Sequence, residues 1–313
     1  MAEISAKLVK ELREVTGAGM MDCKKALTAC DGDMDKAVDF LREKGLAGAQ
    51  KKAGRIAAEG MVDTKLCSCG TKGVVVEVNS ETDFVAKNQK FRDYVAEVAA
   101  QALEAESEDI DAFLAAPWKL DPSMTVAEKL SSMISIIGEN MHIRRFSILE
   151  EENGLVESYI HAGGKIGVLL AVESNVVNDE IREMAKNICM QVAALKPLYT
   201  SSREVSADYI AREKEILKAQ IMNDPKESQK PEKVIDGMIE GRVKKELKEI
   251  VLLDQVYVKA EDGKQSVQEY VNSVAVKNNA TITVKKFVRF ETGEGLEKRN
   301  DDFAAEVAAQ MGK

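Results

Sequence analysis

Residues 73–100 read GVVVEVNSETDFVAKNQKFRDYVAEVAA, and this stretch contains the unit from which the fold is built. The apolar run at 73–78 predicts a buried β-strand, and the spacing of apolar residues over 91–99 predicts an amphipathic helix. The polar residues 79–88 predict a strand-to-helix turn, in which Ser, Thr or Asp side chains can cap the helix. The chain is therefore expected to run strand, turn, helix.

One pair of residues in this turn, Asp83-Phe84, goes beyond what a helix cap needs. A cap requires a small polar side chain and does not require a large aromatic ring beside the acid. Either the pair is buried locally or the turn presents it to a partner. The turn by itself leaves both interpretations open.

The same unit occurs twice in the chain. Residues 60–100 align without a gap on residues 154–194, an offset of 94, the difference between 154 and 60. The identical positions are Gly60/Gly154, Val62/Val156, Gly70/Gly164, Gly73/Gly167, Val74/Val168, Val78/Val172, Ser80/Ser174, Val98/Val192, Ala99/Ala193 and Ala100/Ala194. Each copy predicts a β-hairpin followed by a helix that packs on one face of the sheet, which is an α+β fold.

The two copies differ at the turn itself. Thr82-Asp83-Phe84 in the first copy aligns with Val176-Val177-Asn178 in the second. If the fold alone required an acid and an aromatic residue at this turn, both copies would be expected to keep them. The difference favours a function specific to the first copy.

The first 45 residues predict a small bundle of three short helices, the third beginning after Asp33 and closing at Gly45. Such a bundle is near the lower size limit for independent folding. Leu12 lies on the apolar face of the first helix. Met20 and Met21 are adjacent, so they cannot both face inward. One of them is a candidate for an exposed contact.

The remaining segments complete the two halves and add a helical hairpin. We expect a helix at 125–137, a strand after Gly138, charged helices at 206–220 and 232–251 joined by a turn at 222–231, strands at 256–258 and 281–290, and a final helix at 301–311. The two charged helices predict an antiparallel hairpin, which either braces the core or serves as an arm for a partner.

Composition excludes several classes of function. The net charge of −9 argues against nonspecific nucleic-acid binding, and an aromatic content of 5% argues against a base-stacking surface. The 313 residues contain no apolar run long enough to span a bilayer, and residues 1–5 lack the pattern of a signal peptide. We expect a cytoplasmic protein of two or three domains that binds neither membranes nor nucleic acid.

The cysteines and histidines predict neither a metal site nor an active site. Five cysteines, an odd number, favour reduced thiols over a disulfide framework, and Cys67-Ser68-Cys69 lacks the second pair of a zinc site. The two histidines, His142 and His161, do not have metal-binding spacing. We therefore expect no metal, no cofactor and no covalent catalysis.

Three segments of the chain carry a resemblance to a known family. They are residues 16–27, TGAGMMDCKKAL; residues 82–88, TDFVAKN; and GEN at 138–140 followed by IRR at 143–145. In this order they resemble bacterial elongation factor Ts, the guanine-nucleotide exchange factor for elongation factor Tu, and the similarity extends over essentially the whole chain.

The resemblance implies an α+β architecture of five parts. These are an N-terminal three-helix bundle like a ubiquitin-associated domain, with a linker (1–57), a first core subdomain (58–150), a second core subdomain (151–203 and 256–294), an inserted helical hairpin (204–255) and a C-terminal helical module (295–313). The two subdomains correspond to the duplicated hairpin-and-helix units.

The resemblance also implies a mechanism and a set of contact residues. In the family, the turn equivalent to Thr82, Asp83, Phe84 and Val85 inserts near the Mg²⁺ and phosphate site of the GTPase. The residues expected to contact the partner are Leu12, Met20, Met21, Asp83, Phe84 and His161. No catalytic residue and no bound metal are expected.

Two questions stay open at the level of sequence. The helical hairpin can also join two copies in a homodimer or in a 2:2 complex with the GTPase. The alternative function is a scaffold or chaperone-like module that binds proteins without exchanging nucleotide. An enzyme that uses Cys67 or His161 is a distant third interpretation, because no constellation of reactive groups supports it.

Overall fold

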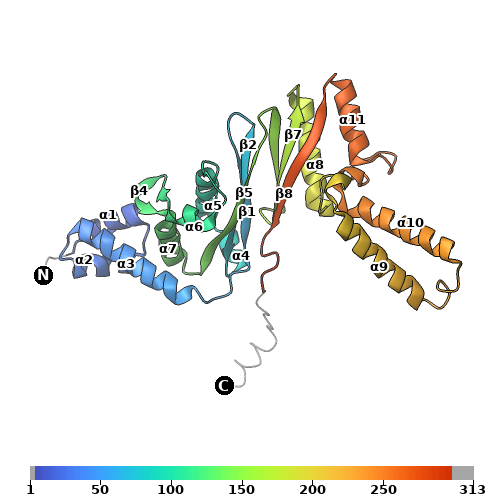
Figure 1. Ribbon diagram of the computed structural model, residues 1–313. Coiled ribbons are helices and arrows are strands. Elements are labelled where there is room, and N and C mark those ends of the chain that lie inside the picture. Colours follow the sequence, from blue (N-terminus) through green and yellow to red (C-terminus); the bar gives the residue numbers. More distant parts are fainter. Residues whose placement is uncertain (1–3, 298–313) are drawn as a thin grey trace.

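Two three-stranded antiparallel sheets form the centre of the computed structural model, which describes residues 4–297 (Figure 1). The first sheet has the order β1-β2-β5 and the second has the order β6-β7-β8. Their bounds are β1 Glu59–Leu66, β2 Lys72–Ser80, β5 Met141–Glu150, β6 Gly154–His161, β7 Ile166–Ser174 and β8 Ile282–Glu291. The mixture of these sheets with helices confirms the predicted α+β class.

The two sheets pack face to face through a shared apolar cluster. Its buried members are Val62, Val75, Leu149, Val156, Leu169, Ala171 and Phe290. Gly167 allows the close approach, since a Cβ there would lie 2.4 Å from Val62 Cγ1. The contacts are reciprocal: the amide of Val62 donates to the carbonyl of Gly164 at 2.7 Å, and Val156, 94 residues after Val62, donates to Gly70 at 2.8 Å. Residues related by the 94-residue offset thus make equivalent contacts across the interface between the two sheets.

One long helix covers the outer face of each sheet. In the first half it is α5 (Gln89–Ala102), preceded by the short helix α4 (Asp83–Ala86); in the second half it is α8 (Asp179–Leu195). The buried faces of both helices consist of apolar residues at helical spacing, as the sequence predicts. Helix α5 includes the fully buried Phe91 and Tyr94, and α8 includes Ile181 and Met184.

A second repeat, with a different offset, became visible only in the structure. Helix α7 (Val126–Ile137) and helix α11 (Val267–Lys277) both begin with a capping box, formed by Thr125 with Glu128 and by Ser266 with Glu269. Each helix leads into the third strand of its sheet, β5 or β8. The offset between them is 141, the difference between 266 and 125. The offset increases from 94 because a helical hairpin is inserted in the second half.

The inserted hairpin consists of α9 (Ala207–Asn223) and α10 (Glu232–Ile250), which lie side by side and extend away from the sheets (Figure 1). Its buried core is Ile221, Ile235, Ile239 and Val243. Short 3₁₀ turns, Ser202–Glu204 and Leu252–Asp254, lie at its base. The hairpin is therefore an independently packed arm, as the charged periodic segments predicted.

The remaining elements of the first half lie between α5 and α7. They are α6 (Ile110–Ala115) and the small hairpin of β3 (Pro117–Trp118) and β4 (Asp121–Thr125). Trp118 is 1% exposed, and its ring lies 6.1 Å from the Tyr94 ring, centroid to centroid. These elements close the open end of the first apolar core.

Three N-terminal helices form the predicted bundle: α1 (Ala6–Thr16), α2 (Met20–Ala29) and α3 (Met34–Lys52). The prediction that α3 ends at Gly45 is wrong, because the helix continues to Lys52. Gly45 is buried, and a Cβ there would lie 3.8 Å from the backbone oxygen of Ser131 on α7. Packing against α7 keeps Gly45 helical, and the Lys51–Lys52 end suits the negative end of the helix dipole.

Two other predictions from the sequence need comment. Residues 256–258 are not a strand of the second sheet, since Val256 forms only an isolated bridge to Ser266. The backbone of this segment pairs instead with the chain just before α11, since the amide of Tyr257 donates to the carbonyl of Gln265 at 2.8 Å. The predicted helix at 301–311 lies outside the described residues.

A buried acid in the first sheet holds the chain that leaves the second sheet. Glu77 is fully buried and accepts hydrogen bonds from Arg144 Nη1 at 3.0 Å and Arg145 Nε at 2.7 Å. It also accepts from the backbone amide of Gly293 at 2.8 Å, just beyond β8. Gly293 has φ +71°, and a Cβ there would lie 2.1 Å from the carbonyl oxygen of Ala58. This cluster therefore joins the two halves at Gly293, where the positive φ and the close Ala58 backbone favour glycine.

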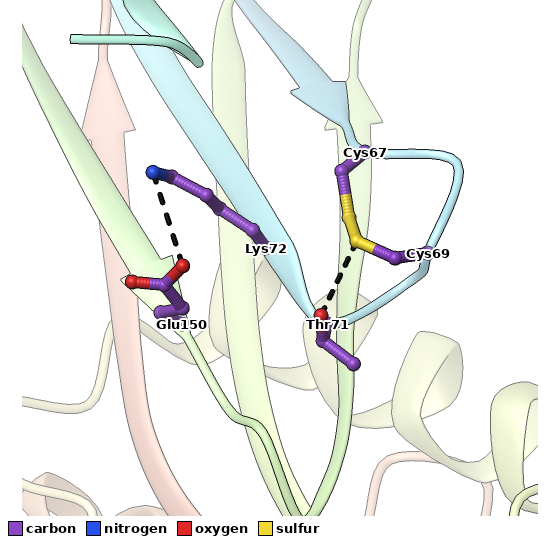
Figure 2. Close-up of a disulfide and its surroundings, with 5 residues drawn as sticks. All are labelled: Cys67, Cys69, Thr71, Lys72 and Glu150. Atoms are coloured by element: carbon purple, nitrogen blue, oxygen red, sulfur yellow. Dashed lines mark hydrogen bonds and ion pairs between the residues drawn. A yellow bond between two sulfur atoms is a disulfide. The ribbon is translucent and has the colours of Figure 1, made fainter.

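The turn between β1 and β2 corrects the prediction that all cysteines are free thiols. Cys67 and Cys69 are joined by a disulfide, with their Cα atoms 5.3 Å apart (Figure 2). The reason is local: the hairpin turn brings the two residues together, so that no larger framework of bridges is needed. Cys23, Cys30 and Cys189 are free. No helix within residues 4–297 is long and apolar enough to cross a membrane.

Candidate functional site

The turn after β2 presents an exposed aromatic ring on a fixed base. Thr82 precedes the short helix α4 in extended conformation, and Phe84 on that helix is 79% exposed. The next residue, Val85, is only 8% exposed and packs into the apolar core of the first half. Exposure of so large an apolar side chain beside a buried anchor is typical of a contact residue. The local-burial interpretation of Asp83-Phe84 is therefore excluded for Phe84.

The carboxylate of Asp83, the residue before Phe84, is paired with Lys87, one helical turn later. Lys87 Nζ lies 2.6 Å from Asp83 Oδ2 and 5.8 Å from the centroid of the Phe84 ring. The hydrogen bond from Lys87 lowers the pKa of Asp83 below its usual range. The carboxylate is therefore charged at neutral pH, and a partner that offers a stronger positive group can compete with Lys87 for it.

An acidic side chain from another segment fixes the base of the turn. Glu139, in the loop before β5, accepts hydrogen bonds from the amide of Thr82 at 3.0 Å and from its hydroxyl at 2.7 Å. In the opposite direction, Glu81 accepts from the amide of Asn140 at 2.5 Å. The Asn140 side chain in turn donates to the carbonyl of Arg55 at 2.8 Å. We call Glu81, Thr82, Glu139 and Asn140 the clamp.

The clamp was not recognised as functional from the sequence. The only available signal was the GEN segment at 138–140, which contributed to the family resemblance without a role assigned to it. Its partners are 57 and 59 residues away in the chain, so local periodicity cannot pair them. The structure adds Glu139 and Asn140 to the residues that position the turn.

The second half has the same frame around a different turn. Ser80 Oγ donates to the carbonyl of Thr82 at 3.1 Å, and Ser174 Oγ donates to the carbonyl of Val176 at 2.6 Å. At the next position, Asn175 accepts from the amide of Thr281 at 2.8 Å, as Glu81 does from Asn140. In place of Phe84 stands Asn178, whose side chain caps α8 through the Ile181 amide at 2.9 Å.

The other predicted contact residues have different surroundings. Met20 and Met21, at the start of α2, are 50% and 62% exposed, so both face solvent and not only one of them. Leu12 is fully buried in the bundle core. Its side chain supports the bundle and is not available for contact, because the second helix covers it. We therefore remove Leu12 from the contact surface and keep both methionines.

His161 is the last residue of β6, close to the first half. Its Nδ1 is 3.0 Å from the hydroxyl of Tyr159, and the side chain is exposed. The carbonyl of Gly163, in the β6–β7 turn that follows, accepts a hydrogen bond from Arg92 on α5 at 3.0 Å. Lys165 is near enough to lower the pKa of Asp83. The β6–β7 turn and the Phe84 turn thus lie on one side of the core, whereas α2 lies in the separate N-terminal bundle (Figure 1).

In residues 4–297, no group of three or more His, Cys, Asp or Glu side chains could hold a metal ion. His142, next to the clamp, has its pKa lowered by burial, and its Nε2 lies 3.0 Å from the side-chain nitrogen Nδ2 of Asn140. The site thus consists of an exposed ring and a carboxylate on a rigid strand-to-helix frame.

Comparison with known proteins places the chain in a class. Residues 81–294, which include the Phe84 turn, β5, the second sheet and the helical hairpin, match the family model described as Elongation factor TS. The chain is thus a translation elongation factor by class.

Curated relatives give the family. Elongation factor Ts of Clostridium perfringens strain SM101 is 49% identical over 310 residues, covering 99% of this chain and all of the relative. Elongation factor Ts of Trichlorobacter lovleyi is 49% identical over 313 residues and 99% of each chain, and that of Clostridium novyi is 48% identical over 98% of this chain and 99% of its own. The chain belongs to the elongation factor Ts family.

Proposed function

We propose that this protein binds the GDP form of elongation factor Tu and promotes the release of GDP by disturbing the Mg²⁺ and phosphate site with the turn Thr82–Val85. The observation that carries this is the 79% exposure of Phe84 on a helix whose next residue is anchored in the core. An exposed ring on a rigid base can enter a groove of a partner at little cost in conformational entropy.

Asp83 and Phe84, which we call the tip of the turn, have complementary effects in this mechanism. A GTPase holds GDP through phosphate-loop amides and Mg²⁺, so that loosening one weakens the other. Phe84 places apolar volume between elements of the partner, and Asp83 brings a negative charge towards a site built around a cation and phosphates. Binding of the exchange factor and of nucleotide must then weaken each other by the same factor. No covalent step is needed.

The rest of the surface contributes binding energy. Met20 and Met21 in the bundle and His161 beside the first half are proposed to contact the partner at further points, as is the C-terminal module 295–313. The division into 1–57, 58–150, 151–203 with 256–294, 204–255 and 295–313 is proposed as the functional division. The hairpin of α9 and α10 is proposed as a second contact, for the partner or for another copy of this chain.

The test is release of a fluorescent GDP analogue from elongation factor Tu, followed by stopped flow. The wild-type chain is expected to accelerate release, and Phe84→Ala to lose most of the acceleration. A wild-type chain that binds the GTPase without accelerating release would overturn the proposal. That outcome would leave a scaffold or chaperone-like module, the alternative function.

A further inference from the structure

The β1–β2 turn contains a pair of cysteines with the geometry for reversible redox chemistry. The Cα atoms of Cys67 and Cys69 are 5.3 Å apart, inside the range that a disulfide requires (Figure 2). The pair lies at the start of β2, while the Phe84 turn follows the end of that nine-residue strand, roughly 30 Å away. It is therefore separate from the proposed exchange site.

The backbone of the turn keeps the two side chains together without help from the sulfurs. The amide of Cys67 donates to the carbonyl of Lys72 at 2.9 Å, and the amide of Gly70 donates to the carbonyl of Cys67 at 3.0 Å. The carbonyl of Gly70 also accepts from Val156 in the second sheet at 2.8 Å. Because these bonds do not involve sulfur, the turn can hold both the dithiol and the disulfide form.

The surroundings of the pair favour reaction with dissolved thiols and disulfides. Cys69 is exposed and Cys67 is partly exposed, whereas Cys23 and Cys189 are buried. The hydroxyl of Thr71 lies 3.2 Å from Cys69 Sγ and can donate to a thiolate there. The Arg182 guanidinium comes within 3.1 Å of the position that a Cβ on Gly70 would take, so a full positive charge borders the turn. Lys72, the first residue of β2, is paired with Glu150 at 3.8 Å.

A stabilising role for the bridge has little physical support. A disulfide stabilises a fold mainly by closing a long loop of the unfolded chain, and the stabilisation grows with loop length. Cys67 and Cys69 are only two positions apart. The burial of Cys189, by contrast, raises the pKa of its thiol well above the ordinary value and makes that residue inert.

We propose that Cys67 and Cys69 form a reversible dithiol–disulfide pair that exchanges with low-molecular-weight thiols and disulfides. In the oxidising direction, the Cys69 thiolate attacks one sulfur of a small disulfide and releases one thiolate, which leaves a mixed disulfide on Cys69. The Cys67 thiolate then attacks Cys69 Sγ and releases the second thiolate. One disulfide bond is made and one is broken, and the two protons of the cysteines pass to the two released thiols.

The test uses the full chain in mixtures of reduced and oxidised glutathione, with acid quenching, alkylation and mass spectrometry of the peptide that contains both residues. The proposal expects the peptide to lose about 2 Da as the share of oxidised glutathione rises, and to regain it with dithiothreitol. In Cys67→Ser the exchange must stop at the mixed disulfide, so Cys69 gains about 305 Da. Cys30→Ser is the matched control and leaves the 67–69 exchange unchanged.

Three outcomes would overturn the proposal. They are a pair that stays alkylatable in fully oxidised glutathione, a bridge that dithiothreitol does not open in the folded chain, and a Cys67→Ser variant in which glutathione adds to Cys30 as readily as to Cys69. Far-UV circular dichroism of each variant shows whether the fold is retained. None of these readouts depends on nucleotide exchange, so they do not test the proposed function.

Discussion

The two halves of the core share a frame and differ in what they present. In both, a β-hairpin leads through a serine-capped turn into a helix, and a third strand is preceded by a helix with a capping box. The first half inserts α4 between strand and helix and exposes Phe84; the second half runs directly into α8, which Asn178 caps. Because the two halves share the frame, the fold does not require the exposed Phe84, and the side chain at this turn can be assigned to a separate role.

Two buried positions show the same contrast in the interior. Glu77 on β2 is equivalent to Ala171 on β7, and the ladder to the third strand shifts register directly after each of them. Glu77 holds two arginines and the exit of β8, while Ala171 packs in the cluster between the sheets. The central strand of a sheet thus accepts either Glu or Ala at this position, and Glu77 is needed to connect the two halves through Gly293.

The largest expected effect comes from removing that buried acid. Glu77→Ala removes the buried carboxylate that Arg144, Arg145 and the Gly293 amide share, and leaves the two arginines only their polar contacts with Glu294, so we expect a loss of about 3–5 kcal/mol in the free energy of unfolding. Urea denaturation followed by circular dichroism measures it. The control is Glu173→Ala, whose pair with Lys285 is about half exposed and is expected to contribute less than about 1 kcal/mol. Equal losses in both variants would mean that Glu77 has no special role.

The next largest effect is on the rate of GDP release, which should distinguish the turn of the first half from the equivalent turn of the second half. Phe84→Ala removes an exposed anchor, and such truncations cost about 2 kcal/mol in binding, or about thirtyfold in the rate of GDP release. Its unfolding free energy should change by less than about 0.5 kcal/mol, because the ring is exposed. Val177→Ala, at the equivalent turn, is expected to leave release unchanged. If Val177→Ala slowed release as much, the proposed asymmetry of the halves would be wrong.

Loosening the clamp should weaken exchange without removing the tip. Glu139→Ala loses both hydrogen bonds to Thr82, and we expect about a tenfold slower release, which corresponds to about 1.4 kcal/mol. Glu139→Gln keeps one acceptor and should recover part of the rate. The matched change in the second half is Asn278→Ala, which breaks the bond to Asn178 and should not affect release. A glutamine variant no better than alanine would contradict a positioning role.

The smallest effect concerns the charge at the tip. Lys87 lowers the pKa of Asp83, so the carboxylate stays charged above the ordinary Asp value and is neutralised only as pH falls through the lowered one. Asp83→Asn is expected to slow GDP release about threefold, by the same ratio to wild type from pH 5.5 to 8. Stopped flow at each pH measures that ratio. A ratio that shrinks towards pH 5.5 would show a raised pKa and contradict this assignment.

Much of the fold could be predicted from the residues, because burial periodicity is a local property. The strand at 73–78, the helix over 91–99 and the 94-residue repeat are all present, and both charged segments form the hairpin. The capped turn also predicted a candidate site, and Phe84 proved exposed. The 141-residue repeat was missed because it depends on caps and backbone positions that few identical residues mark.

The sequence by itself determined the units of this protein: two hairpin-and-helix repeats, a three-helix bundle, a helical arm and one turn with an acid next to an aromatic ring. Only the tertiary structure decided how they are joined. Glu139 meets Thr82 and Glu77 meets Gly293 through the paths of separate backbone segments, and the conformation of the β1–β2 turn brings Cys67 to Cys69. Periodicity along a chain reports which face is buried, whereas a hydrogen bond between distant segments depends on where the packed sheets place them.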